Sequence, residues 1–215
     1  MTRRNTPRIS FIGFGDAGQA IASALREEGI EQIAAWDILF PQAEGAKLKA
    51  AGEQMGVRLA RSAADAVAET DMVISAVTAA SSLEAAQSVA PHLSGNPWYL
   101  DINSVSPGRK HATEKLLDGK ARYVDVAVIA PIHPKRHKPP LLIAGPYAGG
   151  VAPLLEEMEM KLKVVSGETG KAAAIKMIRS VMIKGLEALT LECFLAAERA
   201  GLVDEVAVSM QNNYP

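Results

Sequence analysis

The stretch at residues 8–20 constrains the fold of this chain more than any other part of the sequence. It reads RISFIGFGDAGQA, in which a short apolar strand ends at Gly13 and a helix begins a few residues later. Gly13, Gly15 and Gly18 form the G-x-G-x-x-G pattern of a dinucleotide-binding turn. We expect Gly13 to permit the tight turn, Gly15 to let the backbone approach a pyrophosphate, and Gly18 to let the helix pack closely on the strand.

A carboxylate lies where such a site binds the ribose of its cofactor. A second apolar strand, residues 33–36, ends at Asp37, about 20 residues beyond the turn. We therefore expect NAD or NADP as cofactor, with NAD preferred because a carboxylate repels the 2′-phosphate of NADP. Phe14, Asp16 and Ala17 complete the predicted cofactor turn. The alternative is a glycine turn without a ligand and a solvated Asp37.

Apolar strands and helical segments alternate along most of the chain. This alternation predicts an α/β fold, a Rossmann-type doubly wound parallel sheet, followed by an all-α domain that begins with a long helix. We place the Rossmann domain at residues 1–166 and the start of a helical substrate or dimerisation domain, expected to be truncated, at 167–215. The predicted strands cover residues 9–12, 33–36, 57–59, 71–77, 98–102, 123–128, 141–144 and 162–165.

Three loops follow strand ends of the kind at which such a sheet binds its ligands. They lie at residues 13–18, 77–81 and 103–106. Because the carboxyl ends of parallel strands meet at one edge of a sheet, we expect these loops to line one site. The candidate side chains of the second and third loops are Val77, Thr78, Asn103 and Ser104.

Residues 132–140, which we call the basic loop, interrupt the alternation. They read IHPKRHKPP, with two His, three basic residues and three Pro in nine positions. The loop is either simply solvated or binds an anionic substrate at the mouth of the site through His133, Arg136 and His137. We expect no metal, since two His alone supply too few ligands.

A long predicted helix, residues 171–200, has apolar residues on more than one face, which requires cover on most sides. Lys176 and Ser180 share one face of it, at positions i and i+4. A cation on an otherwise buried helix needs a partner or a function. Lys176 therefore either works in the site or reaches solvent or an acidic neighbour.

The composition limits the partners and the compartment. Lys and Arg number 23 against 24 Asp and Glu, for a net charge of −1, which argues against nucleic-acid or membrane-surface binding. The single cysteine, Cys193, permits no internal disulfide. We see no targeting segment and no long apolar span, so we expect a cytoplasmic protein.

Four motifs along the chain resemble the β-hydroxyacid dehydrogenases, relatives of 3-hydroxyisobutyrate and 6-phosphogluconate dehydrogenase. The motifs are FIGFGDAGQA, DINSVSP, YVDVAV and GKAAAIKMIRS. The resemblance, closest to a poorly characterised branch with a compact helical domain, implies an NAD(P)-dependent oxidoreductase. It also implies a homodimer formed through the helical domain, and a chain that usually continues beyond this length.

The resemblance assigns roles to individual residues. Lys176 falls on the catalytic lysine of the family, a general acid/base, and Asn103 and Ser104 fall where the family contacts cofactor and substrate. Ser180 stands where the family usually has Asn. Pro131 stands where the family binds the substrate carboxylate with backbone amides, and Pro has no N–H to donate. The basic loop is therefore a candidate replacement.

Together, these features predict an oxidoreductase that transfers a hydride between a nicotinamide cofactor and a small hydroxy acid or carbonyl compound, with Lys176 as acid/base. An imine reductase on the same fold is one alternative, although those relatives generally lack the lysine. A non-catalytic NAD(P)-binding regulator is the other.

Overall fold

The computed structural model describes residues 6–213 of the chain, so the ends of the two predicted domains, residues 1–5 and 214–215, lie outside the described residues. The described residues form two compact units that divide between Lys176 and Met177. The division lies inside the long helix α7 (Lys171–Ala200). The predicted domain boundary after residue 166 remains a sequence-based estimate.

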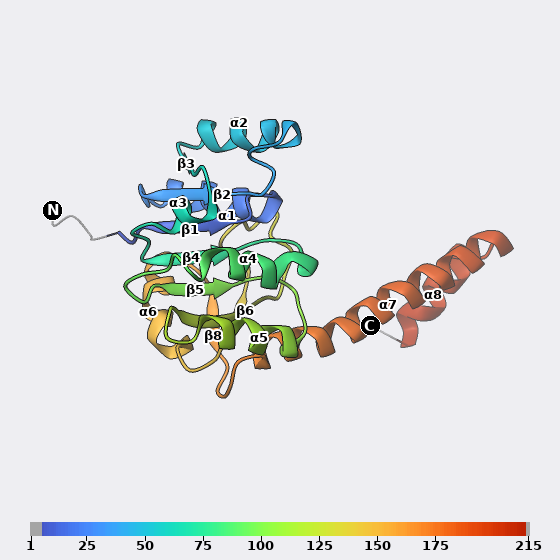
Figure 1. Ribbon diagram of the computed structural model, residues 1–215. Helices are drawn as coiled ribbons and strands as arrows, with labels where there is room; N and C mark the ends of the chain where they lie inside the picture. The colour runs from blue at the N-terminus through green and yellow to red at the C-terminus, as the bar shows by residue number, and fades with distance from the viewer. Residues whose placement is uncertain (1–5, 214–215) are drawn as a thin grey trace. The chain divides into compact units, whose positions relative to one another are not determined.

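The first unit is built on an eight-stranded sheet in the order β3-β2-β1-β4-β5-β6-β7-β8 (Figure 1). The first six strands pair in parallel and give the 3-2-1-4-5-6 order of a Rossmann fold. The predicted fold class is therefore confirmed. The strands are β1 (Ile9–Ile12), β2 (Ile33–Trp36), β3 (Arg58–Leu59), β4 (Met72–Ser75), β5 (Trp98–Asp101), β6 (Arg122–Val128), β7 (Leu141–Ala144) and β8 (Leu162–Val164).

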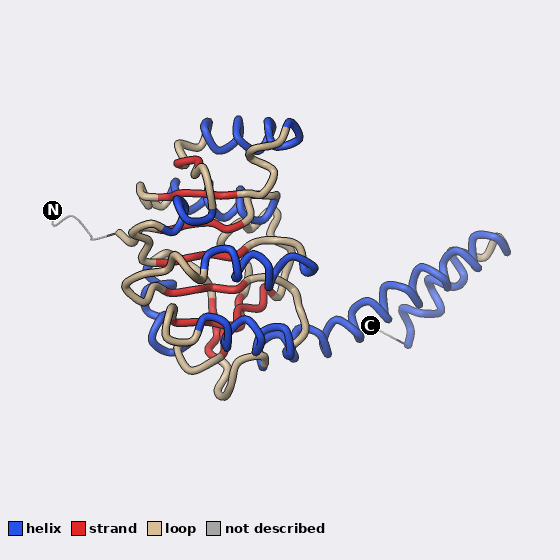
Figure 2. Tube along the Cα trace, in the orientation of Figure 1, coloured by secondary structure: helices blue, strands red, loops and turns tan. Residues whose placement is uncertain are grey.

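Helices cover both faces of this sheet (Figure 2). One apolar cluster joins α1 and α6 to one face, and a second joins α3, α4 and α5 to the other. Ser62 and Ser106 cap α3 and α5 by accepting hydrogen bonds from the N–H groups of Asp65 and Arg109. The helices are α1 (Asp16–Glu27), α2 (Ala46–Gln54), α3 (Ala63–Val67), α4 (Ser82–Val89), α5 (Pro107–Leu117) and α6 (Ala148–Glu157).

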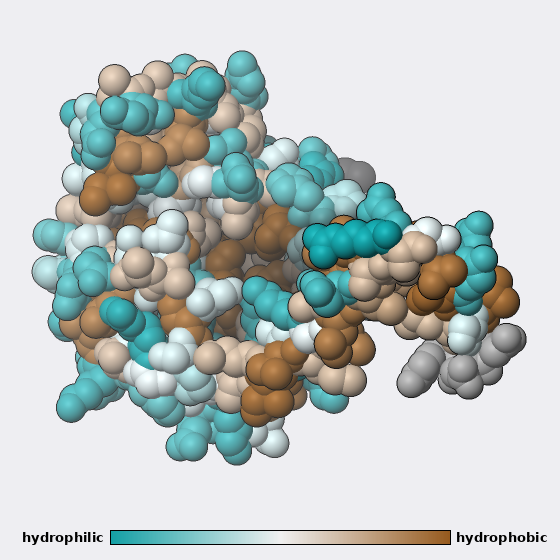
Figure 3. Space-filling view, turned by 90° about the vertical axis from the view of Figure 1, so that its right-hand side faces the viewer, coloured by the Kyte–Doolittle hydropathy of each residue, from teal (hydrophilic) through white to brown (hydrophobic). Residues whose placement is uncertain are grey.

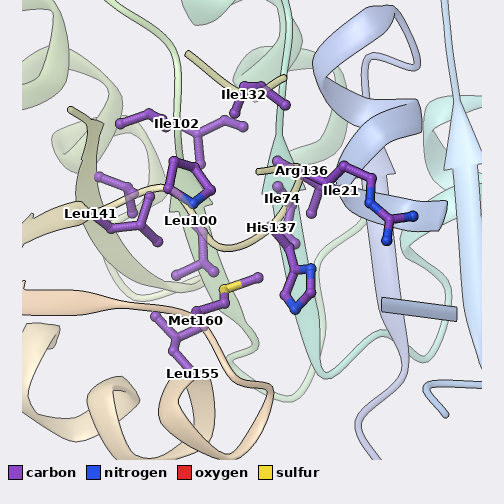
Figure 4. A pocket seen from close by; sticks show the side chains of 13 residues that line it. Ile21, Ile74, Leu100, Ile102, Ile132, Arg136, His137, Leu141, Leu155 and Met160 are labelled. Carbon is purple, nitrogen blue, oxygen red and sulfur yellow. The ribbon is translucent and has the colours of Figure 1, made fainter. Parts of the chain in front are cut away.

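The sheet departs from the predicted all-parallel arrangement at β7, which runs antiparallel to β6. The physical reason is the connection between them: parallel neighbours need a long crossover, usually a helix, and this segment is an irregular loop. The basic loop instead lies over the apolar sheet face, between α1 and α6. There Ile132, His137 and Pro139 line a small apolar cavity with Ile21 and Leu155 (Figure 4).

The second unit consists of the rest of α7 and of α8 (Val203–Asn213). Figure 3 shows hydrophobic side chains, in brown, on the surface of this helical unit. No helix in the described part of the chain is both long and apolar enough to span a bilayer. The exposed apolar residues of the unit include Met177, Ile178, Val181, Met182, Leu186, Leu189, Leu191, Leu202 and Val208.

Candidate functional site

The glycine turn after β1 needs two of its three glycines for its own packing. Gly13 has φ +90°, and a Cβ there would collide with the carbonyl oxygen of Ala76, the residue that follows β4. A Cβ on Gly18 would lie 2.6 Å from the carbonyl oxygen of Gly13. The first glycine therefore permits the turn and the third lets α1 pack against it, as the motif predicts.

Gly15 differs because nothing in the chain requires it to be glycine. No heavy atom lies within 4 Å of a Cβ built there, and its φ of −72° is available to any residue. Gly15 is the N-cap of α1, where free N–H groups and the helix dipole favour an anion. Asp16 is exposed and Ala17 half-buried in the first turn of that helix. The turn thus leaves open space where a phosphate would bind.

Asp37 holds the glycine turn from the end of β2. Its carboxylate accepts hydrogen bonds from the N–H groups of Phe14 at 2.8 Å and of Leu39 at 3.0 Å. The Phe14 side chain is buried and packs edge-on against Phe40. For Phe14 the predicted cofactor contact is therefore limited to its backbone, because the ring belongs to the core.

Asn103 links the loops that follow β4 and β5. Its side chain accepts a bond from Val77 N–H at 2.7 Å and donates to Ser75 and Asp101. It is buried, so its side chain fixes the two loops at this edge of the sheet, and the predicted contact of Asn103 with the cofactor stays a prediction that would involve its backbone. Val77 is half-buried, and Thr78 is exposed at the predicted edge.

Ser104 and Lys176 lie far apart in the sequence and meet at this edge. The Lys176 ammonium donates a hydrogen bond of 2.6 Å to the Ser104 hydroxyl. Burial lowers the pKa of Lys176 below its ordinary value, and the positive charge of Lys110 lowers it further. Ser180 lies one turn further along α7, beyond the division between the units.

A buried charge cluster lies beneath this pair. The Lys110 ammonium is 3.2 Å from a carboxylate oxygen of Asp101 and 3.5 Å from one of Asp125, and all three residues are buried. Tyr123 donates a 2.8 Å bond to the second Asp101 oxygen. Burial, together with the negative charge of Asp101, raises the pKa of the Tyr123 phenol well above its ordinary value.

Sequence reasoning missed Lys110, although a signal was present. Lys110, Thr113 and Leu117 are the buried positions of α5, spaced at i, i+3 and i+7. A lysine on the buried face of a helix needs a buried acid, and Asp101 and Asp125 stand in two apolar strands. Reading the three together would have predicted the cluster.

The basic loop does not lie at the glycine turn. Arg136 forms an ion pair of 2.5 Å with Glu27, the last residue of α1, about 18 Å of helix from its start. Lys138 bonds Glu28 and Glu159, and His137 is buried. The prediction that Arg136 and His137 line the mouth of the site is therefore wrong, because Glu27 at the far end of α1 pairs with Arg136 and the His137 ring is buried among apolar residues under the loop. His133 is exposed, and its predicted role is untested.

Within residues 6–213, no three His, Cys, Asp or Glu side chains gather in a way that could hold a metal ion.

The family model described as NADP oxidoreductase, coenzyme F420-dependent, matches residues 8–103. That range covers the glycine turn, Asp37 and the loops up to Asn103. The first unit thus has an NAD(P)-binding oxidoreductase fold.

Three relatives extend the similarity through the helical unit. An uncharacterised 28.5 kDa protein of Methanothermus fervidus is 32% identical over 199 residues, which cover 93% of this chain and 74% of that protein. A conserved hypothetical protein from Sinorhizobium meliloti 1021 is 38% identical, with a TM-score of 0.79 over 96% of this chain and 70% of its own. A conserved protein of unknown function, described as structurally similar to 3-hydroxyacid dehydrogenases, is 31% identical, with a TM-score of 0.77 over 95% and 75%.

The fold is also shared with better-known enzymes. A Mycobacterium tuberculosis 3-hydroxyisobutyrate dehydrogenase matches 92% of this chain and 67% of its own, with 22% identity and a TM-score of 0.78. The V8 variant of an imine reductase from Myxococcus stipitatus, in complex with NAD+, matches 98% of this chain and 72% of its own, with 21% identity and a TM-score of 0.81. The chain belongs to the β-hydroxyacid dehydrogenase-like family.

Proposed function

We propose that this protein is an NAD(P)-dependent oxidoreductase acting on a small hydroxy acid or carbonyl compound, with Lys176 as general acid/base. The observation that carries the proposal is the open space at Gly15, a glycine that the chain's own packing does not need. Because β1, β4 and β5 are parallel, this space and Ser104 lie at the same edge of the sheet. A bound nicotinamide would supply or accept the hydride at that edge.

The residues at this edge suit proton transfer to a substrate oxygen. In the direction of reduction, the Lys176 ammonium donates a proton to the carbonyl oxygen, and its charge stabilises the negative charge that develops there. In the direction of oxidation, the neutral amine takes the hydroxyl proton. Ser104, already 2.6 Å from the Lys176 nitrogen, orients the amine and offers a hydroxyl to the same oxygen.

The proposed preference for NAD over NADP rests on Asp37. Its carboxylate lies at the end of β2, beside the turn, and is half-buried. A negative charge there favours a ribose with a free 2′-hydroxyl and repels a 2′-phosphate.

Reduction of an imine is the second candidate, supported by the fold shared with the Myxococcus stipitatus imine reductase. A panel of cyclic imines and small 2- and 3-oxo acids, assayed with NADH and NADPH, separates the two. Turnover of the imines alone would replace the first proposal with the second. Cofactor binding without turnover of either the imines or the oxo acids would favour the third alternative, a non-catalytic NAD(P)-binding regulator.

We also propose that the protein forms a homodimer through its helical unit. The exposed apolar side chains on α7 and α8 support this, since a soluble protein rarely leaves so many uncovered. Sedimentation equilibrium tests it: a monomer at micromolar concentration would contradict the proposal.

The Gly15 space is tested by filling it. In Gly15→Val the branched side chain occupies the space at the start of α1, and we expect the affinity for NADH and NADPH to fall by at least about tenfold. Gly149→Val is the matched control, because Gly149 also has open surroundings near a helix start, on α6. Calorimetric titration measures these affinities. An equal loss of affinity in both variants, or no loss in either, would contradict the proposed cofactor site.

A further inference from the structure

Lys110 joins two segments that the proposed function requires to be side by side. Its ammonium donates a 2.6 Å hydrogen bond to the carbonyl oxygen of Asp101, the last residue of β5, in addition to its ion pair with the Asp101 carboxylate. On its other side it faces Asp125 in the middle of β6. Lys110 is thus fixed by groups from two neighbouring strands.

Asp125 extends this contact to the start of α7. One of its carboxylate oxygens accepts hydrogen bonds from the N–H groups of Gly170 at 3.0 Å and Ala173 at 3.2 Å. Gly170 directly precedes α7 and Ala173 is its third residue, at the end of a helix where the N–H groups have no carbonyl partners within the helix. The carboxylate therefore satisfies the helix start and interacts favourably with its dipole.

The two ends of the cluster lead directly to the proposed catalytic pair. Asp101 also accepts bonds from the N–H and the side-chain amide of Asn103, the residue before Ser104. Ala173 lies one helical turn before Lys176. A continuous set of buried polar contacts thus runs from the Ser104 loop through Asp101, Lys110 and Asp125 to the turn that carries Lys176.

We propose that Lys110 is a positioning residue for the Ser104–Lys176 pair, holding the end of β5 and the first turn of α7 together and placing a buried positive charge beneath Lys176. The inference rests on the proposed role of Lys176. It adds a residue outside the cofactor turn and outside the reacting pair, and it gives a buried ammonium on α5 a function in the site.

The charge of Lys110 has a direct consequence for Lys176. A positive neighbour disfavours the protonated amine, and Lys110 acts on Lys176 in the same direction as burial. Asp101 and Asp125 are the other charged members of the cluster. At the helix start, Glu114 of α5 accepts a 2.6 Å hydrogen bond from Thr169, and the His111 ring of the same helix lies 3.3 Å from the position that a Cβ on Gly170 would take. Two carboxylates and one ammonium set the net charge beneath Lys176, so neutralising any one of them changes that charge.

A purely structural role is the competing explanation, because removing one partner of a buried ion pair is strongly destabilising. The test therefore uses two variants with opposite charge effects. Lys110→Met removes the positive charge and keeps the length of the side chain. Asp125→Asn removes a negative charge and keeps an oxygen that can accept from Gly170 and Ala173. Lys115→Met, at an exposed position of the same helix, is the control.

The readout is the protonation of Lys176, measured without turnover. Trace acetylation with acetic anhydride at a series of pH values, followed by mass spectrometry of the peptide that contains Lys176, gives the midpoint of its titration. We expect Lys110→Met to move the midpoint upward and to slow labelling at pH 8 by about threefold or more. We expect Asp125→Asn to move it downward and to speed labelling, and Lys115→Met to change neither.

Opposite movements in the two variants support the inference, even if the protein fails to turn over every substrate in the panel. Movement of both midpoints in the same direction, or of neither, would overturn it. Circular dichroism checks that each variant folds. If Lys110→Met does not fold, Asp125→Asn alone decides: a downward shift supports the inference, and an unchanged or higher midpoint overturns it.

Discussion

The basic loop and the Ser104–Lys176 pair show how differently cationic side chains are used in one unit. In the loop, Glu27 raises the pKa of Arg136, and Glu159 followed by Glu28 raises that of Lys138. For Lys176 the direction is reversed, since burial and Lys110 lower its pKa. Paired surface cations stay charged and hold a loop in place, whereas a partly buried lysine beside a hydroxyl is suited to exchange a proton. The density of basic residues in the sequence therefore favoured the basic loop as the substrate-binding cationic element, although Arg136 and Lys138 form ion pairs on the surface.

The largest effect that separates the two regions is expected for Lys176→Ala. Loss of the proton donor should lower kcat by about 100-fold or more and leave the affinity for the cofactor unchanged. Lys171→Ala is the matched control, because Lys171 is exposed at the start of the same helix. A near-normal turnover in Lys176→Ala would remove this residue from the mechanism.

The pH dependence of turnover follows from the protonation of Lys176. Reduction needs the ammonium, so its rate should be highest at low pH and fall as pH rises through the pKa of Lys176. Oxidation needs the amine, so its rate should rise through the same pKa. Because the pKa of Lys176 is lowered from 10.5, both changes in rate should occur at lower pH than an ordinary lysine would produce. Steady-state rates in both directions check this, and parallel profiles would contradict it.

A smaller effect is expected for Asp37→Asn, which separates the charge of this residue from its bonds. The amide oxygen can still accept from Phe14 or Leu39, as the carboxylate does now. Without the charge, the ratio of NADH to NADPH affinity should fall by roughly tenfold or less. Titration with both cofactors checks this. Tighter NADPH binding by the unaltered protein would show that Asp37 does not select against the 2′-phosphate.

The smallest effect is expected in the basic loop. Arg136→Ala breaks an exposed ion pair with Glu27 at the end of α1 that lies away from the glycine turn. Such pairs contribute little, so Tm should change by no more than about 2 °C, and the KM for an anionic substrate should stay the same. A clear rise in that KM would return the loop to the substrate site.

The sequence predicted the local parts of this fold well. Gly18 acts through the carbonyl group of Gly13 in the same turn, so its pattern carries the structure with it, whereas Gly13 is required by the distant Ala76. The parallel order of the first six strands also followed from the alternation of elements. The antiparallel β7 did not, because a loop without helical periodicity carries no sign of the direction in which the chain returns.

The candidate site was less predictable where its contacts are distant in the sequence. Lys176 meets Ser104 across 72 positions, and a motif resemblance alone suggested that both belong to one site. Nothing local in the sequence indicates that the Asn103 side chain hydrogen-bonds to Val77 and Asp101, or that Glu27 pairs with Arg136. These are choices among partners that only the folded chain brings together.

A crystal structure of the protein grown with NADH tests the proposed site most directly. We expect the pyrophosphate against the backbone N–H groups at the start of α1, over Gly15, and the nicotinamide ring beside Ser104 and Lys176. A dinucleotide bound anywhere else, or a nicotinamide that faces away from the Lys176 amine, would contradict it.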